Sequence, residues 1–216
     1  MEPKLDSKKT CTIYLVRHGE TDWNAQNIIQ GTKGLALNKK GLRQAMEAAK
    51  RLKQIKFDVA YSSDLVRAKK TTEIIALEHK ISVTTNQALR ERTYGEFEGK
   101  SEKYLREKLA DLLKKFNKLS YEKKASYQFP FGIESINSCV SRLVPFLKEI
   151  SITHLNQTIL VGTHSDMIRY FLIHIGFATE TELTDGSISN TAHVKVLSDG
   201  IDFFVTETWG VNKNES

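Results

Sequence analysis

Two short apolar runs organise the chain, and in both the apolar residues are continuous rather than alternating. They are Thr12–Val16 (TIYLV) and Thr158–Gly162 (TILVG), each bounded by polar residues. Strands of a parallel sheet that is covered on both faces have this pattern. A third, shorter strand is predicted at Asp58–Tyr61.

Near the C-terminus the pattern predicts a β-hairpin instead of another parallel strand. Ala192–Leu197 and Ile201–Thr206 flank Ser198-Asp199-Gly200, a group of turn-forming residues.

Between these strands, apolar residues recur every three or four positions, which is the period of an amphipathic helix. Pro145 interrupts one of these stripes, so either a kink or a later helix start is expected there. Gly176 follows another and is a natural helix end. The expected stripes are Leu42, Ala45, Met46, Ala49 and Leu52; Leu105, Leu109, Leu112, Phe116 and Leu119; Ile136, Val140, Leu143, Val144 and Leu147; and Met167, Ile168, Phe171, Leu172 and Ile175.

Because strand and helix patterns alternate, we predict an α/β fold: a three-layer sandwich with a mostly parallel central sheet and helices on both faces. A chain of 216 residues suits one domain, residues 1–216. Residues 98–135 are helical in pattern, basic and then aromatic. We expect this segment to form a small helical cap insertion at the edge of the sheet.

The composition is that of an ordinary globular protein, with 40% hydrophobic and 27% charged residues. No run approaches the roughly 18 apolar residues that span a bilayer, and the polar N-terminus lacks the apolar core of a secretory signal. We therefore expect a soluble, cytoplasmic protein with no membrane partner. Cys11 and Cys139 belong to no metal-binding motif, so two reduced thiols and no metal site are expected.

The formal net charge of +6 raises the question of a polyanionic partner. Residues 100–124 carry nine Lys or Arg against four Asp or Glu, a net +5. No nucleic-acid-binding motif accompanies them, so no nucleic-acid partner is expected. Two interpretations remain open: a solvated helix face, or a basic segment that overhangs the active site and attracts anionic substrates.

Two histidines follow the two main predicted strands. Arg17 and His18 come directly after the first strand, and His164 follows the second. In an open α/β sheet, ligands bind at the carboxyl ends of the strands, so these side chains are expected at one edge. Phosphoryl chemistry needs these residue types together, with an imidazole nitrogen to attack and a guanidinium to hold the oxygens.

Arg67 is expected at the same edge, in the first turn of the helix that follows the third strand. Ser63 or Asp64 is the predicted N-cap of that helix. Together with the histidines, Arg67 is a candidate second clamp on a phosphate group. Glu91 stands between two arginines, and from local sequence alone it is either one half of an ion pair or a functional carboxyl group.

Taken in order, these motifs resemble the histidine phosphatase superfamily, in its phosphoglycerate mutase-like branch. The matching segments run through nearly the whole chain. They are Leu15–Thr21 with Trp23-Asn24; Gln30-Gly31; Leu37-Asn38 with Gly41; Tyr61–Leu65 with Arg67-Ala68 and Thr71; Leu89–Glu91 with Gly95 and Phe97–Gly99; and Gly162–His164 with Ile168-Arg169.

The resemblance implies a role for each matching residue. His18 would accept the phosphoryl group, with its other ring nitrogen donating to a carbonyl-type partner, and Arg17, Arg67 and His164 would form the phosphate pocket. Glu91 would be the general acid/base, which requires a raised pKa. The other residues expected to bind substrate are Asn24, Gln30, Gly31 and Ser165. No cofactor and no metal are expected.

The chain also departs from the family pattern. Ser165-Asp166 stand where many members have two glycines, and we expect Asp166 at a helix N-terminus rather than pointing into the pocket. The Gly-Glu-Ser segment appears as Gly132-Ile133-Glu134-Ser135, with one extra residue. Asn190 is a further candidate for contact with the site.

The resemblance implies a phosphomonoesterase that hydrolyses a small phosphorylated metabolite through phosphohistidine. Two alternatives stay open: a phosphoglycerate mutase, which transfers the phosphoryl group between hydroxyls, and a catalytically silent protein that binds phosphorylated ligands. The motifs act on the phosphate and do not identify the leaving group.

Overall fold

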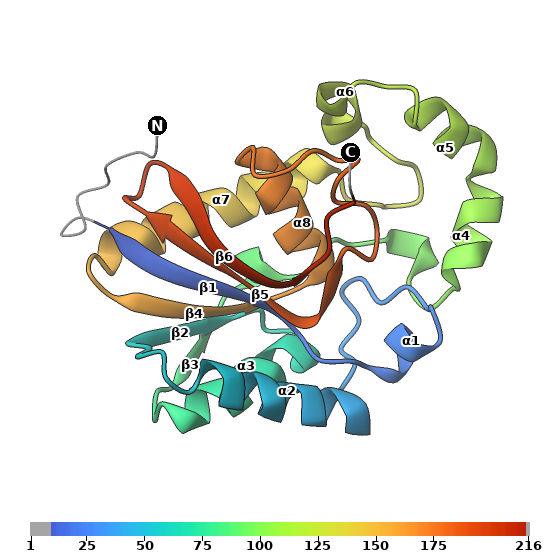
Figure 1. Ribbon diagram of the computed structural model, residues 1–216. Helices are drawn as coiled ribbons and strands as arrows, with labels where there is room; N and C mark the ends of the chain where they lie inside the picture. Colours follow the sequence, from blue (N-terminus) through green and yellow to red (C-terminus); the bar gives the residue numbers. More distant parts are fainter. Residues whose placement is uncertain (1–9, 215–216) are drawn as a thin grey trace.

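The computed structural model describes residues 10–214, and its centre is a six-stranded mixed sheet in the order β3-β2-β4-β1-β5-β6 (Figure 1). Four neighbouring strands run parallel: β3 (Val83–Thr85), β2 (Val59–Ser62), β4 (Thr158–Thr163) and β1 (Cys11–Arg17). The hairpin of β5 (Ile188–Ser198) and β6 (Phe203–Val211) extends the sheet antiparallel to β1. This confirms the predicted mostly parallel sheet and C-terminal hairpin.

Helices cover both faces of the sheet, as predicted (Figure 1). On one face, α2 (Lys39–Leu52) and α3 (Val66–Glu78) pack over an apolar cluster that includes Tyr14, Val16 and Leu160. On the other, α7 (Ile136–Thr153) and α8 (Ser165–His174) pack over a larger cluster that includes Leu15 and Val161. Neighbouring residues of one strand therefore belong to opposite cores, which explains the continuous apolar runs.

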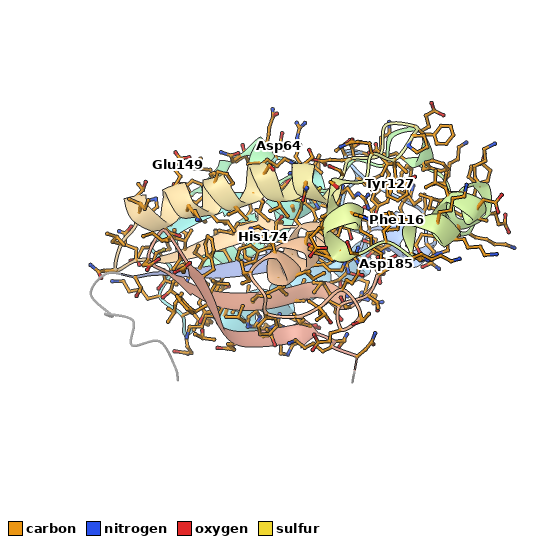
Figure 2. All side chains as sticks on the ribbon, turned by 90° about the horizontal axis from the view of Figure 1, so that it is seen from above. Asp64, Phe116, Tyr127, Glu149, His174 and Asp185 are labelled. Carbon is orange, nitrogen blue, oxygen red and sulfur yellow. The ribbon has the colours of Figure 1, made fainter. Side chains whose placement is uncertain are left out.

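The remaining helices lie beyond the carboxyl ends of the strands (Figure 1). They are α1 (Asp22–Ala25), α4 (Glu102–Lys108), α5 (Ala110–Phe116) and α6 (Tyr121–Ser126). Helices α4 to α6 form the arm that the sequence predicts as a cap within residues 98–135. We call residues 98–135 the cap segment. Figure 2 shows Phe116 and Tyr127 on this arm, and their rings lie 5.4 Å apart.

Several details differ from the sequence prediction. The third stripe forms one helix that starts at Ile136 and continues through Pro145, so the later start was wrong. The second stripe is broken at Leu109, which leaves the helical conformation (φ −105°, ψ 16°) where its side chain is buried beneath the cap. Met46 is exposed rather than buried, and strand β3 was not predicted.

The expected N-cap of α3 was also wrong. Leu65 occupies that position and makes no side-chain cap. The Ser63 hydroxyl instead accepts from the Leu65 N–H at 3.2 Å, and Asp64 pairs with Arg90. Both side chains have been diverted to partners outside the helix.

Within residues 10–214, no helix is both long and apolar enough to cross a membrane. The N-terminal residues behind the expectation about a secretory signal lie almost wholly outside the described part of the chain.

A close backbone approach holds the loop after β1 against helix α2. A Cβ added at Gly41 would lie 2.0 Å from the Glu20 carbonyl oxygen, and one added at Gly19 would lie 2.5 Å from the Gly41 carbonyl oxygen. The Asn38 side chain caps the same helix by accepting from the Gly41 N–H at 2.8 Å. The turn that carries His18 is thus set by the first turn of α2.

We expect Gly41→Ala to lower the free energy of unfolding by about 1–3 kcal/mol, because the backbone of Glu20 must move. The matched control is Gly34→Ala, since nothing lies within 4 Å of a Cβ added there. Urea unfolding midpoints of the two variants and the wild type would check this. Equal midpoints for Gly41→Ala and Gly34→Ala would contradict it.

Candidate active site

The nucleophile candidate lies one residue beyond β1. His18 is 3% exposed, and its N–H donates to the Thr163 carbonyl oxygen of β4 at 3.1 Å. The next N–H, of Gly19, donates to the Thr71 hydroxyl of α3 at 3.0 Å. Two hydrogen bonds from different elements therefore fix the backbone on either side of the imidazole.

The environment of His18 selects one neutral tautomer. Its Nδ1 lies 2.7 Å from the carbonyl oxygen of Gly19, which can accept only from N–H, so Nδ1 carries the proton. Burial, together with the charges of Arg67 and Arg17, holds the pKa of His18 well below its ordinary value. Nε2 is therefore an unprotonated nitrogen at neutral pH, as an in-line nucleophile requires.

Arg67 reaches the same point from the first turn of α3, as predicted. Its side chain is 1% exposed, and its Nε donates to His18 Nε2 at 3.1 Å. Its two amino groups donate to the carbonyl oxygens of Lys33 (2.8 Å) and Gly31 (2.7 Å). Burial lowers the pKa of Arg67 to about 10, so the group stays charged at neutral pH.

The second histidine lies behind the first. His164 is fully buried, and its ring centroid is 5.2 Å from that of His18. Its Nε2 pairs with the Ser63 hydroxyl at 2.9 Å, and its Nδ1 has no partner among the described residues. A proton donated by Ser63 to Nε2 leaves Nδ1–H free for a phosphoryl oxygen.

Glu91 is a buried carboxyl group rather than one half of an ion pair. It is 9% exposed, and its Oε1 accepts from the Arg92 N–H at 3.0 Å. Burial, and then the nearby charge of Asp166, raise the pKa of Glu91 to about 7 despite Arg67 and Arg17. The sequence-based expectation of a raised pKa agrees with this direction.

One cavity of about 560 Å³ joins most of the predicted site residues. His164 does not line it. The predicted residues that do are Arg17, His18, Asn24, Gln30, Gly31, Arg67, Glu91 and Ser165.

The smaller polar residues at the cavity have different local roles. Asn24 completes a reciprocal cap with Thr21 at the start of α1. Gln30 is buried with its Oε1 unpartnered among the described residues. Gly31 has φ +48°, and an added Cβ would collide with the Glu98 side chain, so this position favours glycine. Ser165 begins α8, where the helix dipole favours an anion.

Asp166 lies in the first turn of α8, as expected. It also lines the cavity, whereas the sequence analysis expected it not to point into the pocket. Its carboxylate accepts from the Tyr94 hydroxyl at 2.6 Å and from Arg169 at 3.3 Å. Burial alone would raise the pKa of Asp166, but Arg169, Arg92 and the Tyr94 hydroxyl outweigh it and lower the pKa. These partners explain how a second carboxylate is accommodated beside Glu91.

Sequence reasoning missed an irregularity in β5 that supports the backbone of His18. The register against β6 shifts between Ile188 and His193, and Thr191 has φ +57°. The Asn190 side chain and the Thr191 N–H both donate to the His18 carbonyl oxygen, at 3.0 and 3.3 Å. The sequence analysis named Asn190 as a candidate for contact with the site, and in the structure Asn190 contacts the backbone of His18.

Arg51 of α2 holds this irregular segment in turn. Its Nη2 donates to the Thr191 carbonyl oxygen at 2.9 Å, and its guanidinium lies 3.4 Å from the ring centre of Trp209. Arg51 was hidden in the sequence because a charged residue in a helix normally faces solvent.

The basic residues of the cap segment mostly face solvent. Of the nine in residues 100–124, Arg106 and Lys124 line the cavity. Each is paired with a carboxylate, Arg106 with Asp185 at 3.5 Å and Lys124 with Glu180 at 2.6 Å. The other seven basic residues of this stretch fit the first of the two interpretations from the sequence, a solvated helix face.

Cys11 and Cys139 are buried free thiols, and burial raises the pKa of both. Among the residues that the structure describes, no three His, Cys, Asp or Glu side chains are grouped to hold a metal ion.

The chain matches the model of the histidine phosphatase superfamily (branch 1) over residues 13–211. It is 32% identical over 213 residues to phosphoglycerate mutase-like protein 4 of Arabidopsis thaliana, covering 97% of this chain and 90% of that protein. It is 31% identical over 169 residues to the 2,3-bisphosphoglycerate-dependent phosphoglycerate mutase of Bartonella henselae, covering 75% and 80%.

Solved structures share the fold. A phosphoserine phosphatase of Entamoeba histolytica in complex with 3-phosphoglyceric acid superposes with a TM-score of 0.73 and 25% identity, covering 92% of this chain and 96% of that one. The printed names of the similar proteins thus include both mutases and phosphatases.

We expect Arg51→Ala to lower kcat about tenfold while KM changes less than threefold, because the backbone of His18 loses support and no residue that lines the cavity is removed. Millimolar guanidinium should partly restore kcat by occupying the vacated site. Steady-state kinetics on p-nitrophenyl phosphate would check this, with Arg43→Ala, an exposed arginine on the same helix, as control. An equal loss in both variants, or no rescue, would contradict the assignment.

Proposed function

The chain belongs to the histidine phosphatase superfamily (branch 1), and on that premise we propose that it is a phosphomonoesterase that hydrolyses a small phosphorylated metabolite. The reaction runs through a covalent phosphohistidine on His18, with Glu91 as general acid and base. The observation that carries the proposal is the unprotonated Nε2 of His18, held against Arg67 beside a cavity that Arg17 and Glu91 also line.

In the first step His18 Nε2 attacks phosphorus, and the bond from phosphorus to the ester oxygen breaks. Charge spread over the equatorial oxygens is stabilised by Arg17, Arg67, the Nδ1–H of His164 and the N-terminus of α8. The Arg67 Nε–H, which donates to His18 Nε2 at rest, must turn to a phosphoryl oxygen. Glu91 gives its proton to the departing oxygen, which leaves as an alcohol.

In the second step the Glu91 carboxylate takes a proton from water as the water oxygen attacks phosphorus. The N–P bond breaks, His18 recovers its lone pair, and inorganic phosphate leaves. A pKa of about 7 suits Glu91 to both roles, because both protonation states are populated near neutral pH.

Phosphoryl transfer between hydroxyls is the second candidate, and it is favoured by the names of the relatives. A mutase would use the same first step and return the phosphoryl group from His18 to a second hydroxyl instead of water. The relative from Bartonella henselae is named for this reaction. Turnover of phosphoglycerates only after priming with 2,3-bisphosphoglycerate would favour this candidate.

Hydrolysis of p-nitrophenyl phosphate and a panel of phosphorylated metabolites in the presence of a chelator is the first test. We expect wild-type turnover that is lost at least a thousandfold in His18→Ala, because the nucleophile is gone. His174→Ala, an exposed histidine on α8, is the matched control and should retain full activity. Equal activity in His18→Ala and wild type would refute the phosphohistidine route.

The acid role of Glu91 predicts a pH profile. As pH rises through about 7, Glu91 loses its proton, so kcat/KM for an alkyl phosphate should fall above that pH. Glu91→Gln should lower this kcat/KM about 10²–10⁴-fold and remove its fall above pH 7. Ionisation of the substrate affects the wild type and the variant equally, so the difference between their two pH profiles reports Glu91. Turnover of p-nitrophenyl phosphate, whose leaving group needs little proton donation, should fall less. Full activity of Glu91→Gln on the alkyl ester would show the assignment to be wrong.

A further inference from the structure

The cavity is much larger than a phosphate group requires. Its volume is about 560 Å³, whereas a phosphoryl group has the bulk of roughly three waters at about 30 Å³ each. We call the part of it that is lined by Arg17, His18, Gln30, Gly31 and Arg67 the phosphate end. Most of the volume is therefore left for the leaving group.

The cap segment contributes an apolar wall to the rest of the cavity, which charged and polar side chains also line. Leu105, Leu109, Leu113, Phe129 and Ile133 form what we call the cap pocket. Leu109 and Ile133 are 4% and 6% exposed, and the other three pack against them. The helical spacing of the leucines turns one face of α4 and α5 inward, while the lysines of these helices face solvent.

Two chain segments make the cap pocket continuous with the phosphate end. Ile29, 8% exposed, packs in the same apolar cluster and directly precedes Gln30 and Gly31. Ile133 lies within the segment that carries one residue more than the family pattern, and its backbone bridges to Tyr94. A leaving group bound through its phosphate would thus extend directly over apolar side chains.

Three carboxylates around the cavity, those of Asp166, Asp185 and Glu180, already have partners within the protein. Asp166 binds Tyr94 and Arg169, Asp185 binds Arg169 and Arg106, and Glu180 binds Lys124. These contacts leave no carboxylate of that group without a cation.

Among the charged residues beyond Arg17 and Arg67, Arg92 lines the cavity with no carboxylate within 4 Å of it in residues 10–214. It donates to the Glu134 carbonyl oxygen at 2.7 Å and to the Tyr170 hydroxyl at 2.9 Å. The rings of Tyr94 and Phe129 flank its guanidinium at 5.2 and 5.7 Å, and their π faces offset part of its charge. Arg92 is the group to which a carboxylate on the leaving group would be drawn.

We propose that the cap pocket binds an extended apolar leaving group, so that the substrates are phosphomonoesters of apolar alcohols or phenols rather than short phosphorylated hydroxy acids. This inference rests on the proposed phosphatase function. Affinity for the ester comes from apolar burial in the cap pocket, and the phosphate end supplies the chemistry.

A series of n-alkyl phosphates from ethyl to hexyl tests the proposal, because the leaving oxygen has nearly the same basicity throughout. We expect kcat/KM of the wild type to rise about fourfold for each added methylene, the ratio that burial of one methylene supports. 3-Phosphoglycerate, a short ester with a carboxylate, should react at least tenfold more slowly than hexyl phosphate.

Matched variants locate the effect. Leu113→Ser and Leu105→Ser, which alter the cap pocket, should each reduce the gain per methylene to about twofold or less. Leu112→Ser, at the position of α5 directly before Leu113 and outside the cavity lining, should keep the wild-type gain. Thermal unfolding of the three variants would verify that each remains folded.

The outcomes separate this inference from the function on which it rests. A flat alkyl series, or 3-phosphoglycerate turned over faster than hexyl phosphate, would overturn the apolar leaving group and point to Arg92 as a carboxylate site. A loss of chain-length dependence in Leu112→Ser but not in Leu113→Ser would overturn the assignment to the cap pocket. Failure of the wild type on every ester, p-nitrophenyl phosphate included, would instead refute the phosphatase.

Discussion

The site depends on two guanidinium groups, that of the half-buried Arg17 and that of the buried Arg67, with no carboxylate within 4 Å of either in the described residues. Backbone carbonyls compensate in part, those of Gly31 and Lys33 for Arg67 and that of Ile188 for Arg17. A buried cation without a counter-ion is costly, and the sheet, α2 and α3 together hold the two in place. Burial, together with the same charges, holds the pKa of His18 low and keeps the imidazole neutral. One arrangement therefore both prepares the proposed nucleophile and leaves the site with positive charge that an anion can neutralise.

Much of the fold could be predicted from periodicity, because burial on both faces leaves a continuous apolar run. The runs at β1 and β4 were confirmed, as were the C-terminal hairpin and the helices on both faces. Places where the helical pattern is interrupted were harder to predict. Pro145 is compatible with α7, and Leu109 leaves the helix because tertiary packing overrides local periodicity. Strand β3, of three residues, is too short to carry a pattern.

The candidate site was predictable where side chains meet at the carboxyl ends of neighbouring strands, as with Arg17, His18 and Arg67. It was not predictable where the supporting group is a backbone atom or a long-range partner. The hydrogen bonds from Asn190 and Thr191 to the His18 carbonyl arise from a strand irregularity that no spacing encodes. The hydroxyl of Ser63 resembles a helix cap in sequence, yet it pairs with a histidine 101 positions away.

The cap pocket comes mainly from one uninterrupted stretch of chain, while His18, Arg67, Glu91 and His164 all lie outside that stretch. The proposed reaction chemistry and the proposed recognition of the leaving group therefore fall in separable parts of the sequence. Insertions, deletions or recombination within residues 98–135 can remodel selectivity while the sheet and its buried cations stay intact. A scaffold with this layout can diversify by exchanging a single surface module, which makes the segment a natural place for grafting in enzyme engineering.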